Sequence, residues 1–488
     1  MNSRLSITTL PSSVRDPVNP TNPVNPIRKK TTSHEGKPTS MLCHSNRFPA
    51  QSLASTALAL LALSPMPVIA DPAALLGSGN FTNGGAGTRE ATQYAVLNAA
   101  LLRSCRLNEY PGTYFDVNKG VATPARLDAA VLQAHKFGVT PVILFEFYGS
   151  YSPGIAKYDW NAIGHAFADR FRPNSSWWTN QGIRDFGVSL FQAVNEPDGG
   201  KGLALQDYHD ALKNLADGVH SVDKDLRVIP GGFMTANSAS SYTLKGFGLA
   251  ISDLLNDGTL DGIDLHTYNG RWAPVRPNRH SSQHDFDAIK KACNITRNIH
   301  FYTTEFNYQR SENEDGTAPD YDLGEDAAAR FFLTSIWDQL GVVDADNHPV
   351  CKLALAWNLF DLTSKEKNYG LSIQLDPWEP TRRAQILRTV AELSSGMSFD
   401  SLDPRGTGVF VLSGNQRKLW VWQDRAHYST ITGTSFEVRG IRAGSTKLEV
   451  YGWDGPRASV ALQGQASYTF HDLPGDETYM FLASSGAP

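Results

Sequence analysis

Short apolar segments alternate with amphipathic helical segments along most of this chain, from about residue 73 to residue 395. The helical segments space their apolar residues by three and four, as at Tyr208, Leu212, Leu215 and Val219. Such alternation is typical of parallel strands joined by covering helices. The apolar segments, in chain order, are residues 74–81, 105–110, 141–147, 186–194, 227–233, 262–268, 299–304 and 352–360.

Eight such repeats predict an α/β fold, a (β/α)₈ TIM barrel with inserted loops. An open doubly wound sheet is the alternative, but it would normally carry a glycine-rich phosphate turn after its first strand. Gly77 and Gly79 lie inside the first apolar segment, and no third glycine completes such a turn. The pattern therefore favours the barrel.

The periodicity changes to two near residue 400. Segments that alternate apolar and polar residues, separated by Gly, Asp and Ser turns, follow at residues 409–412, 418–422, 435–438, 447–451, 459–462 and 479–482. They predict a small antiparallel β-sandwich. This domain either covers one side of the barrel or binds carbohydrate through an exposed Trp420, Trp422 or Trp453.

The first 70 residues have a different character. Residues 1–40 repeat Pro and Asn turns without apolar periodicity, which predicts a disordered extension. Residues 41–70 resemble a secretion signal, with Arg47, an apolar stretch and small residues before Asp71, so we expect a secreted or periplasmic protein. The expected division is residues 1–40 (extension), 41–70 (signal peptide), 71–398 (catalytic barrel) and 399–488 (sandwich).

Composition excludes several classes of protein. The formal net charge of -5 gives no polycationic face, so nucleic acid is not an expected partner. No apolar run reaches the ~20 residues of a membrane span. Cys and His show no metal-site spacing, so we expect no metal and no cofactor. Cys43 would leave with the signal, and Cys293 with Cys351 is the candidate disulfide.

Two predicted strands deliver a glutamate at their C-terminal ends. The fourth apolar segment ends on Asn195, Glu196 and Pro197, and the seventh ends on Glu305. Because these strand ends meet at one end of a barrel, the two carboxyls can flank a single bond. Paired carboxyls are the groups that glycoside hydrolysis requires.

Other polar and aromatic residues fall at the same predicted strand ends. A lone strand-end Arg is more often a structural ion pair, and a lone Trp is more often part of a core, but several together predict a pocket. These residues are Arg106, Glu109, Glu146, Asn195, His266, Tyr268 and Trp357.

Together these residues resemble clan A of the retaining glycosidases, in which the acid/base Glu ends strand four, usually after Asn, and the nucleophile Glu ends strand seven. The resemblance spans residues 73–395. Within clan A the chain is most similar to family 39, on segments Asp264–Tyr268 and Asn368–Leu371, although families 5 and 30 share most of these marks.

The resemblance implies a role for each residue. Glu196 would protonate the leaving oxygen and later activate water, while Glu305 would attack the anomeric carbon. Tyr268 and Arg106 would donate hydrogen bonds to Glu305 and lower its pKa. Asn195 would hydrogen-bond the sugar 2-hydroxyl, and His266 would contact the substrate or Glu196. Trp357 would form the floor of a sugar subsite. Glu109 and Glu146 would anchor loops or bind sugar hydroxyls.

The resemblance thus implies a hydrolase that cleaves a β-linked or equatorial bond of a poly- or oligosaccharide by double displacement, with the carboxyls about 5 Å apart. A transglycosylase of the same fold and a catalytically silent carbohydrate-binding barrel are the alternatives. A mere binder has no need of paired carboxylates. The loops expected to select the sugar are residues 148–158, 271–284 and 309–322.

Overall fold

The computed structural model describes residues 71–81, 97–98, 100–147, 149–199, 202–234, 243–269, 281–308, 324–359, 370–375, 378–414, 416–423, 434–475 and 477–485. The expected extension and signal peptide, and most of the loops at 271–284 and 309–322, lie outside these ranges. Within them, no helix combines the length and the apolar character that a membrane crossing requires.

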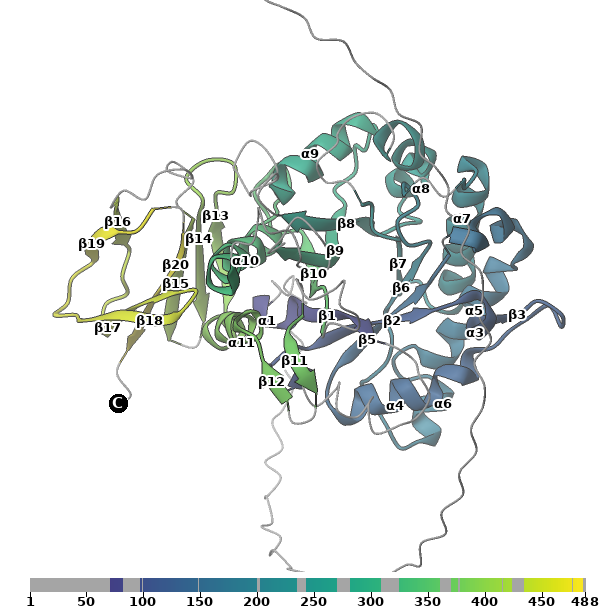
Figure 1. Ribbon diagram of the computed structural model, residues 1–488, viewed down its shortest axis with the longest axis horizontal. Coiled ribbons are helices and arrows are strands. Elements are labelled where there is room, and N and C mark those ends of the chain that lie inside the picture. Colours follow the sequence, from purple (N-terminus) through teal and green to yellow (C-terminus); the bar gives the residue numbers. More distant parts are fainter. Residues whose placement is uncertain are drawn as a thin grey trace, which may run out of the picture. The chain divides into compact units, whose positions relative to one another are not determined.

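Parallel strands form the predicted barrel, which helices surround (Figure 1). The strands are β1 (Leu76–Phe81), β2 (Ser104–Glu109), β5 (Thr140–Phe145), β6 (Leu190–Ala193), β7 (Arg227–Pro230), β8 (Gly262–Asn269), β9 (His300–Tyr308) and β10 (Cys351–Ala356), in the order β7-β6-β5-β2-β1-β10-β9-β8. An isolated bridge between Phe233 and Leu265 joins the last two edges. The (β/α)₈ expectation is therefore confirmed.

The principal helices bury their apolar faces against the strands, and the four regularly spaced residues of α7 are all buried. The helices are α4 (Asp128–Lys136), α5 (Trp160–Phe171), α7 (Leu205–Val222), α8 (Ser252–Asp257), α9 (Ser282–Ala292), α10 (Gly324–Leu340) and α11 (Arg382–Ser394). Shorter elements are α1 (Pro72–Leu75), α3 (Pro111–Tyr114), α6 (Ser176–Asn180), the 3₁₀ helices η1 (Pro124–Leu127) and η2 (Gly149–Lys157), the π-helix η3 (Thr243–Gly248) and the hairpins β3 (Phe115–Asp116)/β4 (Val121–Ala122) and β11 (Ser372–Leu375)/β12 (Trp378–Pro380).

Strands β1 and β6 begin later in the chain than expected. Helix α1 precedes the first strand, because the Asp71 carboxylate caps Ala73 N at 3.0 Å and Pro72 occupies the first helical turn, so the first strand starts only at Leu76. Strand β6 covers Leu190–Ala193 rather than residues 186–194. Its end coincides with a sharp turn that carries the first candidate glutamate.

The C-terminal strands form the predicted sandwich. A six-stranded sheet has the order β13 (Ser398–Leu402), β14 (Val409–Gly414), β15 (Arg417–Gln423), β20 (Thr478–Ser485), β17 (Ser445–Gly452) and β18 (Gly455–Ala461), and β16 (Thr434–Arg439) pairs with β19 (Ser467–Leu473). Trp420 and Trp422 are buried in the sandwich core, where Trp422 stacks on Phe436. These two rings therefore serve packing rather than an exposed sugar platform, and Trp453 is half-buried beside Arg382.

The expected disulfide is wrong. Cys105, Cys293 and Cys351 are buried, and Cys293 is not bonded to Cys351. Burial raises the pKa of Cys293 to about 11 and that of Cys351 to about 12, so both thiols stay protonated and unreactive.

Candidate active site

A strained turn after β6 positions Glu196. Val194 and Glu196 have positive φ values of 64° and 47°, which non-glycine residues seldom adopt. The Glu196 amide donates to the Gly232 carbonyl at 3.1 Å, and a Cβ on Gly231 would lie 2.0 Å from the Val194 oxygen. The residue that follows the neighbouring strand β7 must therefore be glycine for this turn to form.

A β-bulge in β9 positions Glu305. Asp264 pairs with Tyr302 and His266 pairs with Glu305, so three steps along β9 oppose two along β8. The extra residue lets both Thr304 and Glu305 contact groups inside the barrel, while Phe306 stacks on Phe332 of α10 outside it. The usual alternation of a strand would have turned one of the two away.

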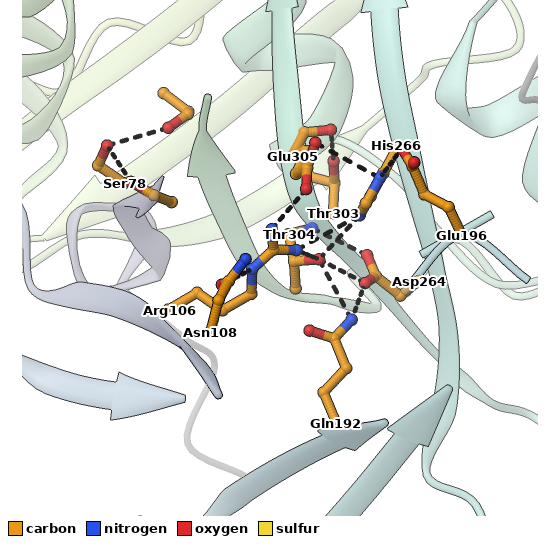
Figure 2. Close-up of polar contacts among 12 residues, drawn as sticks. Ser78, Arg106, Asn108, Gln192, Glu196, Asp264, His266, Thr303, Thr304 and Glu305 are labelled. Atoms are coloured by element: carbon orange, nitrogen blue, oxygen red, sulfur yellow. Dashed lines mark hydrogen bonds and ion pairs between the residues drawn. The ribbon is translucent and has the colours of Figure 1, made fainter. Parts of the chain in front are cut away.

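The two glutamates converge on His266. The His266 Nδ1 lies 2.9 Å from Glu196 Oε1 and 3.5 Å from Glu305 Oε2. A carboxylate oxygen of each glutamate lies within 4.8 Å of one on the other. Figure 2 shows Glu196 and Glu305 on either side of the imidazole. The two carboxyls are therefore close enough to act on the two sides of a single substrate bond.

Glu305 is held as an anion. Arg106 Nη2 donates to Glu305 Oε1, and the Tyr268 hydroxyl donates to Oε2 at 2.5 Å. Burial by itself would raise the pKa of Glu305, but the charges of His266 and Arg106 and the Tyr268 hydrogen bond outweigh it and lower that pKa. The expected support of Glu305 by Tyr268 and Arg106 is present in this geometry.

His266 carries a proton between the two carboxylates. Burial by itself would lower its pKa, but the charges of Glu305 and Glu196 prevail and raise the pKa to about 9. Its side chain is fully buried, whereas that of Glu196 is 22 % exposed. Glu196 is thus the carboxyl open to an incoming oxygen, and Glu305 is the enclosed one.

A polar network below the glutamates was not predicted from the sequence. The Asp264 carboxylate accepts from Thr304 N at 2.8 Å, from Thr304 Oγ1 at 2.5 Å and from Gln192 Nε2. Arg106 Nη1 donates to the same Thr304 hydroxyl at 2.8 Å. Figure 2 shows these side chains meeting beneath Glu305. The spacing by two of Asp264, His266 and Tyr268 was the available signal, because it places all three on one strand face.

The other predicted residues lie at separate places around the two glutamates. Trp357 lies at the barrel mouth, with its ring centroid 5.8 Å from Arg106 Cζ. Glu146 is buried after β5 and its charge acts on Arg106. Asn195 is 9 % exposed, and its Oδ1 has no hydrogen-bond partner within the described ranges.

Glu109 does not join the pair of glutamates. It lies three residues after the inward-facing Arg106, so strand alternation directs it towards the covering helices. Burial raises its pKa to about 7, and a hydrogen bond with Thr113 of α3 partly opposes this rise. These contacts suit an anchor for α3 rather than a sugar contact.

Glu196, His266 and Glu305 are close enough to be considered as metal ligands. A ligating His must be neutral, however, and the pKa of about 9 opposes loss of its proton. A second cluster, Asp344, Asp346 and His348, is a turn in which Asp344 Oδ1 accepts the other two backbone amides at 2.9 Å each. The arrangement of Glu196, His266 and Glu305 is therefore better explained by hydrogen bonds than by a bound metal.

The barrel has the fold of several solved glycoside hydrolases. The chain is similar to a family 39 glycoside hydrolase from Bacteroides cellulosilyticus WH2, with 16% identity and a TM-score of 0.57 over 86% of this chain and 83% of that one. It is also similar to a family 30 endoxylanase from Clostridium papyrosolvens C71, with 13% identity and a TM-score of 0.51 over 84% and 96% of the two chains.

A family 51 α-L-arabinofuranosidase from Bifidobacterium longum is similar as well, with 14% identity and a TM-score of 0.53 over 87% of this chain and 98% of that one. No family model and no curated protein matches the sequence. At these identities the likeness concerns the fold, and the named activities of the three enzymes differ. The fold therefore does not select a sugar.

Proposed function

We propose that this chain is a retaining glycoside hydrolase that cleaves a β-linked or equatorial glycosidic bond of a poly- or oligosaccharide. The observation that carries this proposal is the approach of Glu196 and Glu305. One carboxylate oxygen of Glu196 lies within 4.8 Å of one carboxylate oxygen of Glu305. Retaining enzymes place their carboxyls about 5–5.5 Å apart, whereas inverting enzymes leave ~6.5–9.5 Å for a water.

In the first step Glu305 attacks the anomeric carbon and the bond to the leaving oxygen breaks. Glu305 is suited to this because Arg106 and Tyr268 keep it ionised and fix both of its oxygens. Glu196 gives its proton to the departing oxygen, and its partial exposure leaves room for that group. His266, protonated and 2.9 Å from Glu196, can return a proton to it in the free enzyme.

In the second step water attacks the glycosyl ester, with Glu196 as the base, and Glu305 is released. Esterification removes the Glu305 charge, which is the strongest of the interactions that raise the His266 pKa. Glu196 enters this step without a proton, because it gave its proton to the leaving oxygen in the first step. Asn195, with its unpaired Oδ1, is the proposed partner of the 2-hydroxyl, and Trp357 is the proposed floor.

Stereochemistry and chemical rescue test this proposal together. A panel of aryl glycosides and polysaccharides, followed by NMR of the first product anomer, should reveal a substrate hydrolysed with retention. Glu305→Ala should abolish turnover, and added azide should give a glycosyl azide of inverted configuration. Glu196→Ala with azide should give the retained azide from an activated substrate.

Glu109→Gln is the matched control, because it alters a carboxyl at the same barrel end without touching the pair, and it should keep near-wild-type turnover. An inverted first product, or substantial activity of Glu305→Ala, would contradict the proposal. Sugar binding by the wild type without turnover of any substrate would indicate the silent binding barrel instead.

Secretion is part of the proposal and depends on the pattern at residues 41–70. In its support, Asp71 caps α1 and also accepts the Gly396 amide at 2.8 Å, so a chain beginning at Asp71 keeps its first helix. N-terminal sequencing of exported protein should begin near Asp71. A start before Met41 would refute the assignment.

A further inference from the structure

A polar cavity lies at the opposite end of the barrel from the glutamates. Its volume is about 130 Å³, and its walls include the first residues of β2, β5 and β7. A buried apolar cluster inside the barrel, which includes Val142, Ile229 and Leu355, fills the space between the two ends. The polar and charged residues of the cavity are Ser104, Thr140, Ser189, Arg227, Tyr302 and Lys352.

The cavity has more positive than negative charge. The Lys352 ammonium is half-buried and has no hydrogen bond or ion pair with any group in the described ranges, and burial together with the Arg227 charge lowers its pKa. Asp261 is the nearby carboxylate, but its Oδ2 already accepts from His300 at 2.7 Å and from the Tyr302 hydroxyl. Arg227 is only loosely paired with Asp261, at 3.9 Å, and its other partner is the Tyr302 hydroxyl.

We infer that this cavity binds a small tetrahedral oxyanion, of the phosphate or sulfate type, between Lys352 and Arg227. Its volume is several times the roughly 30 Å³ that one water occupies in the liquid, which is enough for such an ion. Arg and Lys donate charge-assisted hydrogen bonds to oxyanions, and the hydroxyls of Ser104, Thr140 and Ser189 add neutral donors. The anion would relieve the repulsion between the two cations.

Because an anion bound only by the folded barrel stabilises it by mass action, melting temperature is the first measurement. The intact protein is titrated with sodium phosphate or sodium sulfate, with sodium chloride at matched ionic strength as reference. Phosphate and sulfate also stabilise proteins through general exclusion from their surfaces, but that effect does not saturate. We expect a saturable rise in melting temperature above the chloride curve, and a phosphate isotherm by calorimetry.

Lys352→Met keeps the apolar stem and removes the charge, so apparent phosphate affinity should fall about tenfold, the value of one such hydrogen bond. Arg227→Gln provides a second test if the first variant folds poorly. Lys224→Met, which removes an exposed lysine that does not line the cavity, should bind as the wild type does. Glycosidase activity should not change in any of them.

A sugar phosphate tested beside inorganic phosphate distinguishes the sources of the ligand. Tighter binding of the sugar phosphate points to a phosphoryl group on a larger molecule, and tighter binding of inorganic phosphate points to the free ion. The same isotherm for Lys352→Met, Arg227→Gln and the wild type would mean an adventitious ion only and would overturn the inference. No saturable response of the wild type would do so as well.

Discussion

Glu305 differs from an ordinary surface carboxylate because each of its oxygens has a fixed donor. One donor is charged, Arg106, and the other is the neutral Tyr268 hydroxyl. Removing Arg106 would not test the Glu305 contact by itself, since it would also remove the hydrogen bond from Arg106 to Thr304. Tyr268 is the neutral donor, and it therefore gives the cleaner test of how Glu305 is held as an anion.

Tyr268→Phe should lower kcat by about tenfold to a hundredfold, because a hydrogen bond to a charged group contributes about 1.5–3 kcal/mol. It should also move the acidic limb of the kcat/KM profile to higher pH, because one group that lowers the Glu305 pKa is lost. The measurement is kcat/KM against pH. Tyr468→Phe in the sandwich is the control, and an unmoved acidic limb would contradict the argument.

His266 links the active site to the pH dependence of stability. Its pKa is about 9 in the folded chain against 6.5 as a free side chain, so the folded state binds this proton more tightly. The resulting stabilisation is complete below about pH 6.5 and is lost as pH rises through about 9. For Glu305 the sign is opposite: its lowered pKa stabilises the fold above the ordinary Glu value, and this is lost on acidification.

His266→Asn retains a donor towards Glu196 and removes the titration. Its melting temperature should therefore fall less steeply than that of the wild type between about pH 6.5 and 9. Calorimetric scans across this range measure the difference. His471→Asn, at an exposed sandwich site, should keep the wild-type slope, and parallel curves for His266→Asn would show that its proton is not coupled to folding.

At the scale of elements, the site depends on two departures from regular strands. Strand β6 ends in a turn with two positive φ values, and β9 contains a bulge. Both features direct a carboxyl into the barrel that regular geometry would place elsewhere. The segment that follows β7 must leave room for this arrangement, and it does so with the consecutive glycines Gly231 and Gly232.

Gly232→Ala tests that requirement, since its Cβ would lie 2.1 Å from His266 Cδ2. The ring is buried, so we expect a loss of about 1–3 kcal/mol in stability from overpacking. We also expect kcat to fall at least about tenfold, as His266 moves away from Glu196. Thermal unfolding and kcat are measured for this variant and for Gly112→Ala, whose Cβ would meet no atom within 4 Å. Equal behaviour of the two would argue against the close fit.

Helix and strand boundaries show where sequence patterns were sufficient. The apolar periodicity of α7 and the continuous apolar run of β5 located both elements closely. The first strand was placed too early because Ala74 and Leu75, which belong to helix α1, were interpreted as part of the apolar strand. The Asp264 and Thr304 network was missed because it depends on the bulge, which no local pattern announces.

At the scale of the whole molecule, barrel and sandwich share one apolar core. Phe410 is fully buried, and its ring lies against Gly341, where a Cβ would come within 2.7 Å. Thr334 of α10 meets the Thr478 hydroxyl at 2.8 Å, and its carbonyl accepts from Gln423 at 3.0 Å. The sandwich therefore packs on α10 and covers this side of the barrel.

Phe410→Ala should destabilise the protein by about 3–5 kcal/mol, as expected for a buried aromatic, while unfolding stays a single transition. Urea denaturation followed by helical circular dichroism and by Trp fluorescence should give one common midpoint. Phe436→Ala, in the separate sandwich core, removes a ring that does not face the barrel. Two separated transitions in Phe410→Ala would show that the domains fold independently.

The sequence by itself determined the number of strand–helix units, the change to a sandwich near residue 400, and the place of Glu196 just after the fourth strand. These features are periodic or local, so each is written in residues close together in the chain. Tertiary structure alone decided that Glu196 and Glu305 meet at His266 and that Cys293 does not pair with Cys351. Those outcomes depend on a bulge, a strained turn and contacts between segments far apart in sequence, which no single segment encodes.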